Sequence, residues 1–206
     1  MTNERVSPAS EDFGFGAIFE PSVQKHTTMN SINQNQPEDN HEDLMGNEAI
    51  EKIKELVDKS STCFFCTNIQ SNQSFSTRPM HVQQTDDQGN LWFLSANDSK
   101  HDQELAQDPS IQLLFQGSQY SDFLNIYGKA SISADKAKIK ELWNPMLKTW
   151  FTEGIDDPRI SVIKVRPTEG YYWDTKNHIA VGFIKRLVGA AIGKTLDDSI
   201  EGNIKL

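Results

Sequence analysis

Alternation of hydrophobic and polar residues dominates the chain between residues 62 and 174. This pattern predicts β-strands, because successive side chains of a strand point to opposite faces. The predicted strands are Thr62–Ile69, Phe75–Thr85, Leu91–Ala96, Ile111–Gly117, Phe123–Ser133 and Ile160–Val165, the last continuing into Tyr171–Asp174. The first connections are too short for parallel crossovers, so the early strands should pair antiparallel. Six strands, each with one face exposed to solvent, predict a mainly β fold. The expected architecture is a closed or nearly closed barrel with flanking helices.

Helical spacing of apolar residues marks the segments around these strands. One helix is expected to begin at Asn47, a capping residue, and to bury a single face. Its apolar positions are Ile50, Ile53, Leu56 and Val57. A second helical stretch begins at a capping Asp135 and restarts at Asn144-Pro145, where Asn caps and Pro opens a new helix. Its apolar stripe includes Trp143 and Trp150 and fits either a core or an interface.

Changes in composition define the expected domains. Residues 1–45 are polar and acidic, with eight acids against two bases, and are expected to form a disordered tail. Within this tail Phe13–Phe19 is an apolar knot, which either docks or stays mobile. Residues 46–176 are the expected barrel domain, and residues 177–206 a helical extension packed on the barrel. The apolar face of that extension, for which membrane attachment is the less favoured alternative, comprises Ala180, Ile184, Leu187, Val188, Ala191 and Ile192.

Charge and cysteine content limit the function classes. The net charge is -9, and residues 1–45 account for -6 of it, so generic nucleic-acid binding, which needs a basic face, is disfavoured. No apolar core follows a basic start, and Ile179–Gly193 is too short for a membrane helix, which predicts a cytoplasmic protein without membrane attachment. Cys63 and Cys66 fall on opposite faces of a predicted strand. We therefore expect two buried thiols rather than a disulfide or a shared metal.

The first candidate binding segment is Ser76–Met80, inside a predicted strand. Pro79 cannot donate to a strand ladder, so the backbone here must lie at an edge or a bulge with polar groups available to a ligand. Arg78 shares a face with Ser76 and Met80, which brings together a cation, a hydroxyl and an apolar surface. An edge strand protected from aggregation by Pro and Arg is the alternative interpretation.

The second candidate segment is the end of the strand Leu91–Ser95 together with Ser99-Lys100, where a helix is expected to begin. A helix start offers unpaired N–H groups and the positive end of a dipole, which suit a phosphate, and Lys100 adds a full charge. The alternative is an ordinary N-cap at Ser99 with solvated charges. We identify no catalytic residue and no metal site, because no nucleophile triad is present and none of the five histidines has ligand spacing.

Taken in order, these segments resemble the general stress protein 26-like branch of the pyridoxamine 5'-phosphate oxidase-like, FMN-binding split-barrel family. The likeness rests on Ser76–Met80, Leu91–Ser95, Ser99-Lys100, Gly128–Ala130, Leu142-Trp143, Trp150-Phe151, Gly154–Pro158 and Tyr172–Asp174. It covers most of residues 47–175, and its specificity lies in the order and spacing of the pieces.

The resemblance implies a six-stranded antiparallel split barrel that forms a homodimer with one FMN in each groove between subunits. Arg78 and Lys100, helped by Ser95 and Ser99, would then hold the phosphate. Backbone around Pro79 and Met80 would meet the polar edge of the isoalloxazine. The ring would be covered by Trp143 and Trp150, from the neighbouring subunit or its border.

Two departures from the family pattern refine this expectation. Thr152 stands where many relatives carry Pro, a change that should not alter the site. The C-terminal residues 200–206 lack the Arg-and-His ending of true pyridoxamine phosphate oxidases, which makes vitamin B6 oxidation an unfavoured activity. Three hypotheses therefore stay open: a flavin-binding stress protein of weak or undefined redox activity, an FMN-dependent oxidoreductase using a nicotinamide or small organic substrate, and a non-catalytic module that binds a protein partner.

Overall fold

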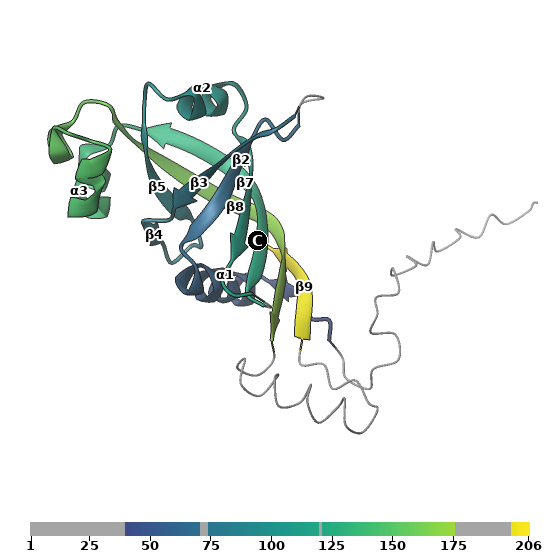
Figure 1. Cartoon of the computed structure of the whole chain (residues 1–206). Helices are drawn as coiled ribbons and strands as arrows, with labels where there is room; N and C mark the ends of the chain where they lie inside the picture. The colour runs from purple at the N-terminus through teal and green to yellow at the C-terminus, as the bar shows by residue number, and fades with distance from the viewer. Residues whose placement is uncertain (1–39, 71–73, 120, 176–198) are drawn as a thin grey trace, which may run out of the picture. The chain divides into compact units, whose positions relative to one another are not determined.

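The computed structural model describes residues 40–70, 74–119, 121–175 and 199–206, and these residues form a mainly β fold with a few flanking helices (Figure 1). The strands are β1 (Leu44–Met45), β2 (Thr62–Thr67), β3 (Ser76–His81), β4 (Gln84–Thr85), β5 (Leu91–Ala96), β6 (Ser110–Gln116), β7 (Phe123–Ser133), β8 (Ile160–Thr175) and β9 (Ser199–Lys205). The α-helices are α1 (Asn47–Lys59), α2 (Lys100–Gln107) and α3 (Lys136–Leu142), and two 3-10 helices, η1 (Pro145–Thr149) and η2 (Gly154–Asp156), follow α3.

Six strands form the split barrel that the sequence predicted. The ladder runs β3-β2-β6-β7-β8, and β8 also pairs with β5, which in turn pairs with β4. Only two residues separate β3 from β4: the Val82 N–H donates to Ser61 and the Gln83 N–H donates to Trp92. One segment, 76–85, therefore leaves β2 and joins β5. The predicted strand Phe75–Thr85 is thus two strands with a change of partner between them.

Strand β8 forms a wall that extends from one end of the fold to the other. Along one side it pairs antiparallel with β7 from Val162 to Trp173. Along the other side it pairs first with β5, over Ile160–Val165, and then with β9, over Glu169–Thr175. The strand predicted as Ile160–Val165 continuing into Tyr171–Asp174 is confirmed as one element.

Two hydrophobic clusters follow from the alternation of side chains. The larger one fills the interior with the inward residues of β2, β5, β6, β7 and β8. Alternation along β7 predicts Leu124, Ile126, Gly128, Ala130 and Ile132 on the buried side; this is confirmed as far as Ala130, whereas Ile132 is exposed. The smaller one lies on the other face of β5 and β8, where α3 and η1 cover it. In this part of the chain both cysteines are buried and free, and Cys63 belongs to the interior cluster. No helix within the described ranges is long and apolar enough to cross a membrane.

The helix caps agree with the sequence except at α1. Asp135 accepts from the N–H groups of Ala137 and Lys138, and Asn144 caps η1 with Pro145 at its start. Asn47, the expected cap of α1, is instead its first helical residue. The cap is Gly46 with a φ of 56°, a conformation that glycine adopts without steric cost.

The edges of the expected domains differ from the prediction. Residues 199–205, assigned to a helical extension, form strand β9 instead. Strand β1, assigned to the tail, pairs parallel with β9, and Leu44 is buried. Gly202 explains part of this, because a Cβ there would collide with the backbone of Glu42. The helix face from Ala180 to Ile192 and the Phe13–Phe19 knot lie outside the described residues, so the remaining domain limits stay predictions.

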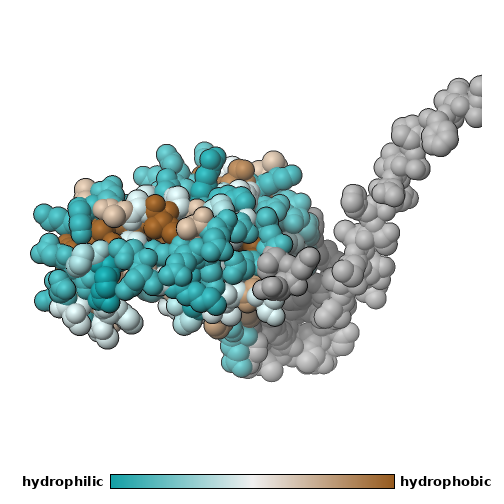
Figure 2. Space-filling view, turned by 90° about the horizontal axis from the view of Figure 1, so that it is seen from above, coloured by the Kyte–Doolittle hydropathy of each residue, from teal (hydrophilic) through white to brown (hydrophobic). Residues whose placement is uncertain are grey.

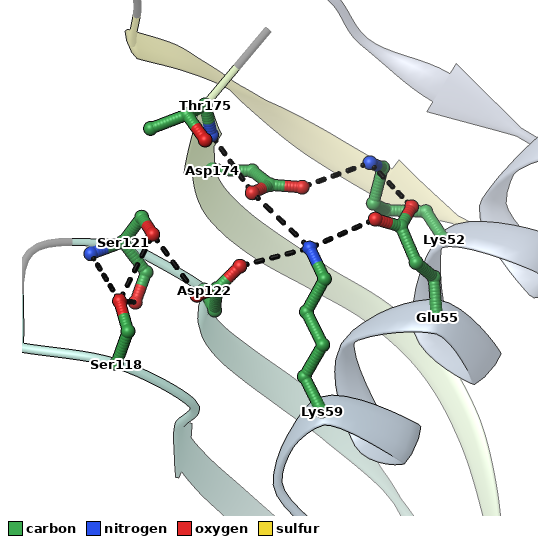
Figure 3. Close-up of polar contacts among 8 residues, drawn as sticks. All are labelled: Lys52, Glu55, Lys59, Ser118, Ser121, Asp122, Asp174 and Thr175. Carbon is green, nitrogen blue, oxygen red and sulfur yellow. Dashed lines mark hydrogen bonds and ion pairs between the residues drawn. The ribbon is translucent and has the colours of Figure 1, made fainter. Parts of the chain in front are cut away.

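A cluster of ion pairs joins α1 to the ends of β7 and β8 (Figure 3). We name it the α1 cluster; its charged members are Lys52, Glu55, Lys59, Asp122 and Asp174. The Lys59 Nζ lies 2.8 Å from Asp122 and 2.9 Å from Glu55, and the Lys52 Nζ lies 3.1 Å from Asp174. Burial alone would lower the pKa of Lys59, but its hydrogen bonds to Asp122 and Glu55 raise it. Every charged group of the α1 cluster therefore has a partner of opposite charge.

Candidate functional site

A groove of about 510 Å³ opens beside β3 and β5. Strand β3 contributes Pro79, Met80 and His81, and the facing wall comes from η1 and the residues just after it. The full lining is Thr62, Pro79, Met80, His81, Gln83, Leu94, Ser95, Ala96, Leu147, Trp150 and Phe151. One side of the groove is therefore largely apolar, while the hydroxyl, imidazole and amide side chains lie mainly near β3. A planar aromatic molecule with polar edges fits this division.

The sequence of β3 explains how it supplies both a groove wall and a buried cation. The strand is the last in its ladder and pairs only with β2, so the missing N–H of Pro79 costs no hydrogen bond. The edge position predicted for Pro79 is confirmed. Alternation exposes Thr77, Pro79 and His81, and turns Arg78 to the other side with Ser76 and Met80, as the sequence predicted.

Helix α2 begins where the groove ends. Ser99 is its N-cap, and the Ser99 Oγ accepts a hydrogen bond from the Asp102 N–H at 3.1 Å. The Ser95 Oγ, which lines the groove, lies 3.5 Å from the Ser99 Oγ. Lys100 follows directly and its side chain is 82% exposed. A phosphate carried by a molecule in the groove would therefore meet hydroxyls and the positive end of a helix dipole at Ser95.

Arg78 and Lys100 meet at one carboxylate, that of Glu104 on α2. Arg78 Nη2 donates to Glu104 Oε2 at 2.7 Å, and Lys100 Nζ lies 3.5 Å from Oε1. Thr67 and Ser76 also donate to this carboxylate, at 2.6 and 2.9 Å. Burial alone would raise the pKa of Glu104, but the hydrogen bonds from Thr67, Arg78 and Ser76 outweigh it and lower the pKa to about 2. Glu104 is thus an anion at every physiological pH.

Two further titratable residues of α2 complete this group. Asp102 accepts from the Ser161 hydroxyl at 2.6 Å. His101 is only 3% exposed, its ring packs edge-on against Phe65 at 4.6 Å, and neither ring nitrogen has a hydrogen-bond partner among the described residues. Burial and then the nearby Arg78 lower the pKa of His101 to about 4, although Glu104 acts in the opposite direction. We name Arg78, Lys100, His101, Asp102 and Glu104 the α2 cluster.

The structure brings most of the predicted site residues into one region. Pro79, Met80, Ser95 and Trp150 line the groove. Ser99 and Lys100 lie at the start of α2, which Ser95 connects to the groove, and Arg78 on β3 contacts the same helix at Glu104. Their binding roles stay predictions.

The two predicted tryptophans lie in different places. Trp150 lines the groove of its own chain, and a contribution from a neighbouring subunit stays a prediction. Trp143 is not among the lining residues. It is partly buried in the smaller hydrophobic cluster, with its ring 6.3 Å from that of Phe151. The apolar stripe that contains both tryptophans was open to two interpretations, a core or an interface. Trp143 lies in a hydrophobic core, whereas Trp150 lies in the exposed wall of the groove.

Sequence reasoning missed Glu104, His101 and the groove residue His81. A signal for the first two was present in the helical spacing. His101, Glu104 and Leu105 stand at positions i, i+3 and i+4, so they share the face of α2 that Leu105 buries. Two polar residues on that face predict partners inside the fold.

Fold and site together define a class of protein: split barrels with a ligand-sized groove and two cations, Arg78 and Lys100, beside helix α2. The family described as pyridoxamine 5'-phosphate oxidase-like matches residues 48–197 of the chain. The chain belongs to this family.

Solved structures share the fold. A general stress protein 26 candidate from Jannaschia sp. CCS1 has a TM-score of 0.65 at 20% identity. The match covers 76% of this chain and 97% of that one. General stress protein 26 from Bacillus anthracis has a TM-score of 0.52 at 24% identity, covering 60% and 92%. The general stress FMN/FAD binding protein from Xanthomonas citri has a TM-score of 0.50 at 24% identity, covering 61% and 87%.

A curated relative extends the comparison to sequence. Protein bli-3 of Neurospora crassa is 32% identical over 96 residues, which are 42% of this chain and 46% of the relative. The chain therefore matches less than half the length of that relative.

Proposed function

We propose that the chain binds FMN, with the isoalloxazine in the groove and the phosphate at the α2 cluster. The single observation that carries the proposal is the continuity of the two regions: Ser95 lines an apolar groove of about 510 Å³, and its hydroxyl lies beside Ser99 at the start of α2. A flat ring would lie between the β3 wall at Pro79 and Met80 and the exposed indole of Trp150. The FMN/FAD binding relative of the same fold supports a flavin as the ligand.

The charges of the α2 cluster favour an anion at this position. Arg78 and Lys100 both contact Glu104, whereas Asp102, the second carboxylate of the cluster, is hydrogen-bonded to Ser161 and Ser99 and pairs with neither cation. Lys100 is free to move toward a ligand because its side chain is 82% exposed and its contact with Glu104 is long, at 3.5 Å. Arg78 is anchored by the Thr67 hydroxyl and Glu104, which presets its position. Charge-assisted hydrogen bonds to phosphate would follow.

We propose further that the chain forms a homodimer through the outer face of β2 and β6. Phe64 on β2 lies directly opposite Leu114 on β6, and these side chains are 57% and 38% exposed. Pro79 is the partner of Phe64 on the other side, so this apolar face reaches the rim of the groove. The hydrophobic patches on the otherwise hydrophilic surface in Figure 2 show that apolar side chains do reach the exterior. Contiguous exposed apolar surface of this kind favours association.

A flavin-dependent oxidoreductase acting on a nicotinamide or small organic substrate is the activity we propose, with a non-catalytic flavin- or partner-binding module as the alternative. FMN would supply the hydride-accepting chemistry. The groove keeps polar groups beside its apolar wall: Thr62 Oγ1 lies 3.4 Å from Nδ1 of the exposed His81, and Gln83 accepts from Asn144. These polar side chains would orient a second molecule, the substrate, at the open side of the groove.

The absorption spectrum of the purified protein tests the flavin proposal. A yellow protein that releases FMN supports it, and a colourless protein that binds neither added FMN nor FAD would overturn it. Bleaching of the bound flavin by NADH or NADPH under nitrogen would favour the oxidoreductase over the module.

A double substitution tests the phosphate site. Arg78→Ala with Lys100→Ala is expected to weaken FMN binding by roughly a hundredfold or more, because two charge-assisted hydrogen bonds are lost. Riboflavin, which lacks the phosphate, should bind both proteins equally. The matched control, Arg166→Ala with Lys205→Ala, removes two exposed cations elsewhere and should leave FMN affinity unchanged. Equal FMN affinity in the wild type and the Arg78/Lys100 double mutant contradicts the assignment.

Substitution in the apolar face tests the homodimer. Phe64→Glu is expected to shift the protein from dimer to monomer, since it places two charges in an interface that should be apolar. Sedimentation velocity measures the change, and Phe75→Glu, an equally exposed aromatic position at the start of β3, serves as control. A wild-type monomer at micromolar concentration would exclude this interface.

A further inference from the structure

The least explained residue in the described part of the chain is His101. It is 3% exposed, and both of its ring nitrogens lack a hydrogen-bond partner among the described residues. A buried polar group without a partner destabilises the folded state, whereas an apolar residue of similar shape would not. The edge-on contact with Phe65 uses the ring but not its nitrogens. Orphaned nitrogens of this kind are available to a partner that the described residues do not supply.

The surroundings of His101 identify the partner it lacks. Arg78 from β3 and Glu104 from its own helix act on it electrostatically, and Phe65 from β2 packs against its ring. Lys100 and Asp102, its neighbours in the first turn of α2, complete the charged groups near it. The α2 cluster thus contains two cations and two carboxylates, so it is neutral while His101 is neutral. A dianion entering a neutral, partly buried cluster leaves two units of negative charge uncompensated, and a protonated His101 would supply one unit of positive charge.

We infer that His101 couples anion binding at the start of α2 to the uptake of one proton. The inference rests on the proposed function, since the anion is the phosphate of FMN, and it assigns that site a dependence on pH. The proton comes from solvent when the phosphate binds, resides on the imidazole ring, and returns to solvent when the phosphate leaves. No bond is formed or broken other than this N–H bond. The protonated ring offers two donors where the neutral ring offers one.

Electrostatics gives the direction of the coupling. In the empty cluster, burial and the Arg78 guanidinium hold the pKa of His101 at about 4, so the ring is neutral near pH 7. An adjacent dianion stabilises the charged ring and opposes both effects. By thermodynamic linkage, an anion that raises this pKa must bind more tightly as the pH falls.

Nuclear magnetic resonance of the wild-type protein tests the inference directly. The His101 ring, followed in protein labelled with nitrogen-15 histidine, is expected to titrate near pH 4 without ligand. Saturating FMN should raise its midpoint by about two pH units or more. An unchanged midpoint in the FMN complex overturns the inference while leaving the flavin proposal intact.

Affinity measurements provide the second readout. Between pH 7.5 and pH 5.5 the gain in FMN affinity of the wild type should exceed that of His101→Gln by about fourfold, the linkage expected when the midpoint rises from about 4 to about 6. Protonation of the FMN phosphate is common to both proteins and cancels in this comparison. His41→Gln, an exposed histidine at the β1 edge, should behave as wild type. Equal pH profiles for wild type and His101→Gln contradict the inference.

Inorganic phosphate separates failure of this inference from failure of the flavin proposal. If wild type binds no FMN but phosphate raises the His101 midpoint, the proton-coupled anion site stands and the flavin proposal fails. If neither FMN nor phosphate moves the midpoint, the inference fails. Because the resonance experiment uses only wild-type protein, the test does not depend on the folding of a variant.

Discussion

The two ends of the barrel carry ionic clusters of different character. The α1 cluster joins Lys52 and Lys59 to three carboxylates, and each charged group has an opposite partner within 3.5 Å. The α2 cluster has similar composition but contains an exposed Lys100 and a buried His101 with unpaired nitrogens. Complete pairing indicates a cluster whose role is to hold a helix on the sheet. Incomplete pairing, here of a buried histidine, indicates a cluster arranged for an additional group.

The largest expected effect comes from a substitution that breaks the α1 cluster. Asp174→Ala removes a buried carboxylate that Lys52 and Lys59 share and leaves them only Glu55 and Asp122 as partners, which should cost about 3–5 kcal/mol of unfolding free energy. Denaturant unfolding measures the loss, and FMN affinity of the folded fraction should not change. Asp87→Ala, which removes an exposed partner of Lys54, should have no measurable effect on stability. A change in FMN affinity on Asp174→Ala would show that the two ends are coupled.

The next effect concerns the stability of the α2 cluster between pH 6.5 and pH 4, where its buried histidine titrates. His101 has its pKa lowered from 6.5 to about 4 in the folded state, so between these values the unfolded chain binds a proton that the folded chain does not. Stability is therefore complete above pH 6.5 and declines as the pH falls toward 4, by about 3 kcal/mol in total. Unfolding of the FMN-free protein at several pH values should show this slope. His101→Gln should remove it, and an identical slope in both proteins would contradict the burial argument.

The smallest expected effect comes from a substitution that changes one charge of the α2 cluster and so sharpens its comparison with the α1 cluster. Glu104→Gln keeps an acceptor for Arg78 and Thr67 but gives the α2 cluster a net positive charge. FMN should bind roughly tenfold more tightly, because a negative charge near the phosphate is removed. Riboflavin affinity should stay the same, and fluorescence titration measures both. Weaker FMN binding would mean that Glu104 acts mainly by positioning Arg78.

The sequence predicted the fold well because strand alternation and capping are local signals. The six barrel strands, the caps at Ser99, Asp135 and Asn144, and the face of Arg78 all follow from residues within a few positions of one another. Strand β9 was missed because Gly202 interrupts the period-two pattern of Ile200 and Ile204.

The site was predicted less completely because its contacts join distant segments. Arg78 and Lys100 were expected to meet at a phosphate, whereas in this structure they meet at Glu104, a pairing that depends on how α2 packs against β3. Trp143 and Trp150 share one stripe, and only the placement of η1 separates the buried ring from the exposed one. Neither difference is encoded in spacing along one element.

Strand β8 places a limit on how the length of this protein can vary. Its side chain at Ser161 bonds to the α2 cluster and its side chain at Asp174 bonds to the α1 cluster, with one continuous strand between them. Deleting a single residue near Arg166 would shift the register of one half relative to the other and turn that half of its side chains to the opposite face. Insertions and deletions among homologous chains should therefore accumulate in the loops, while the distance between these two positions stays at thirteen residues.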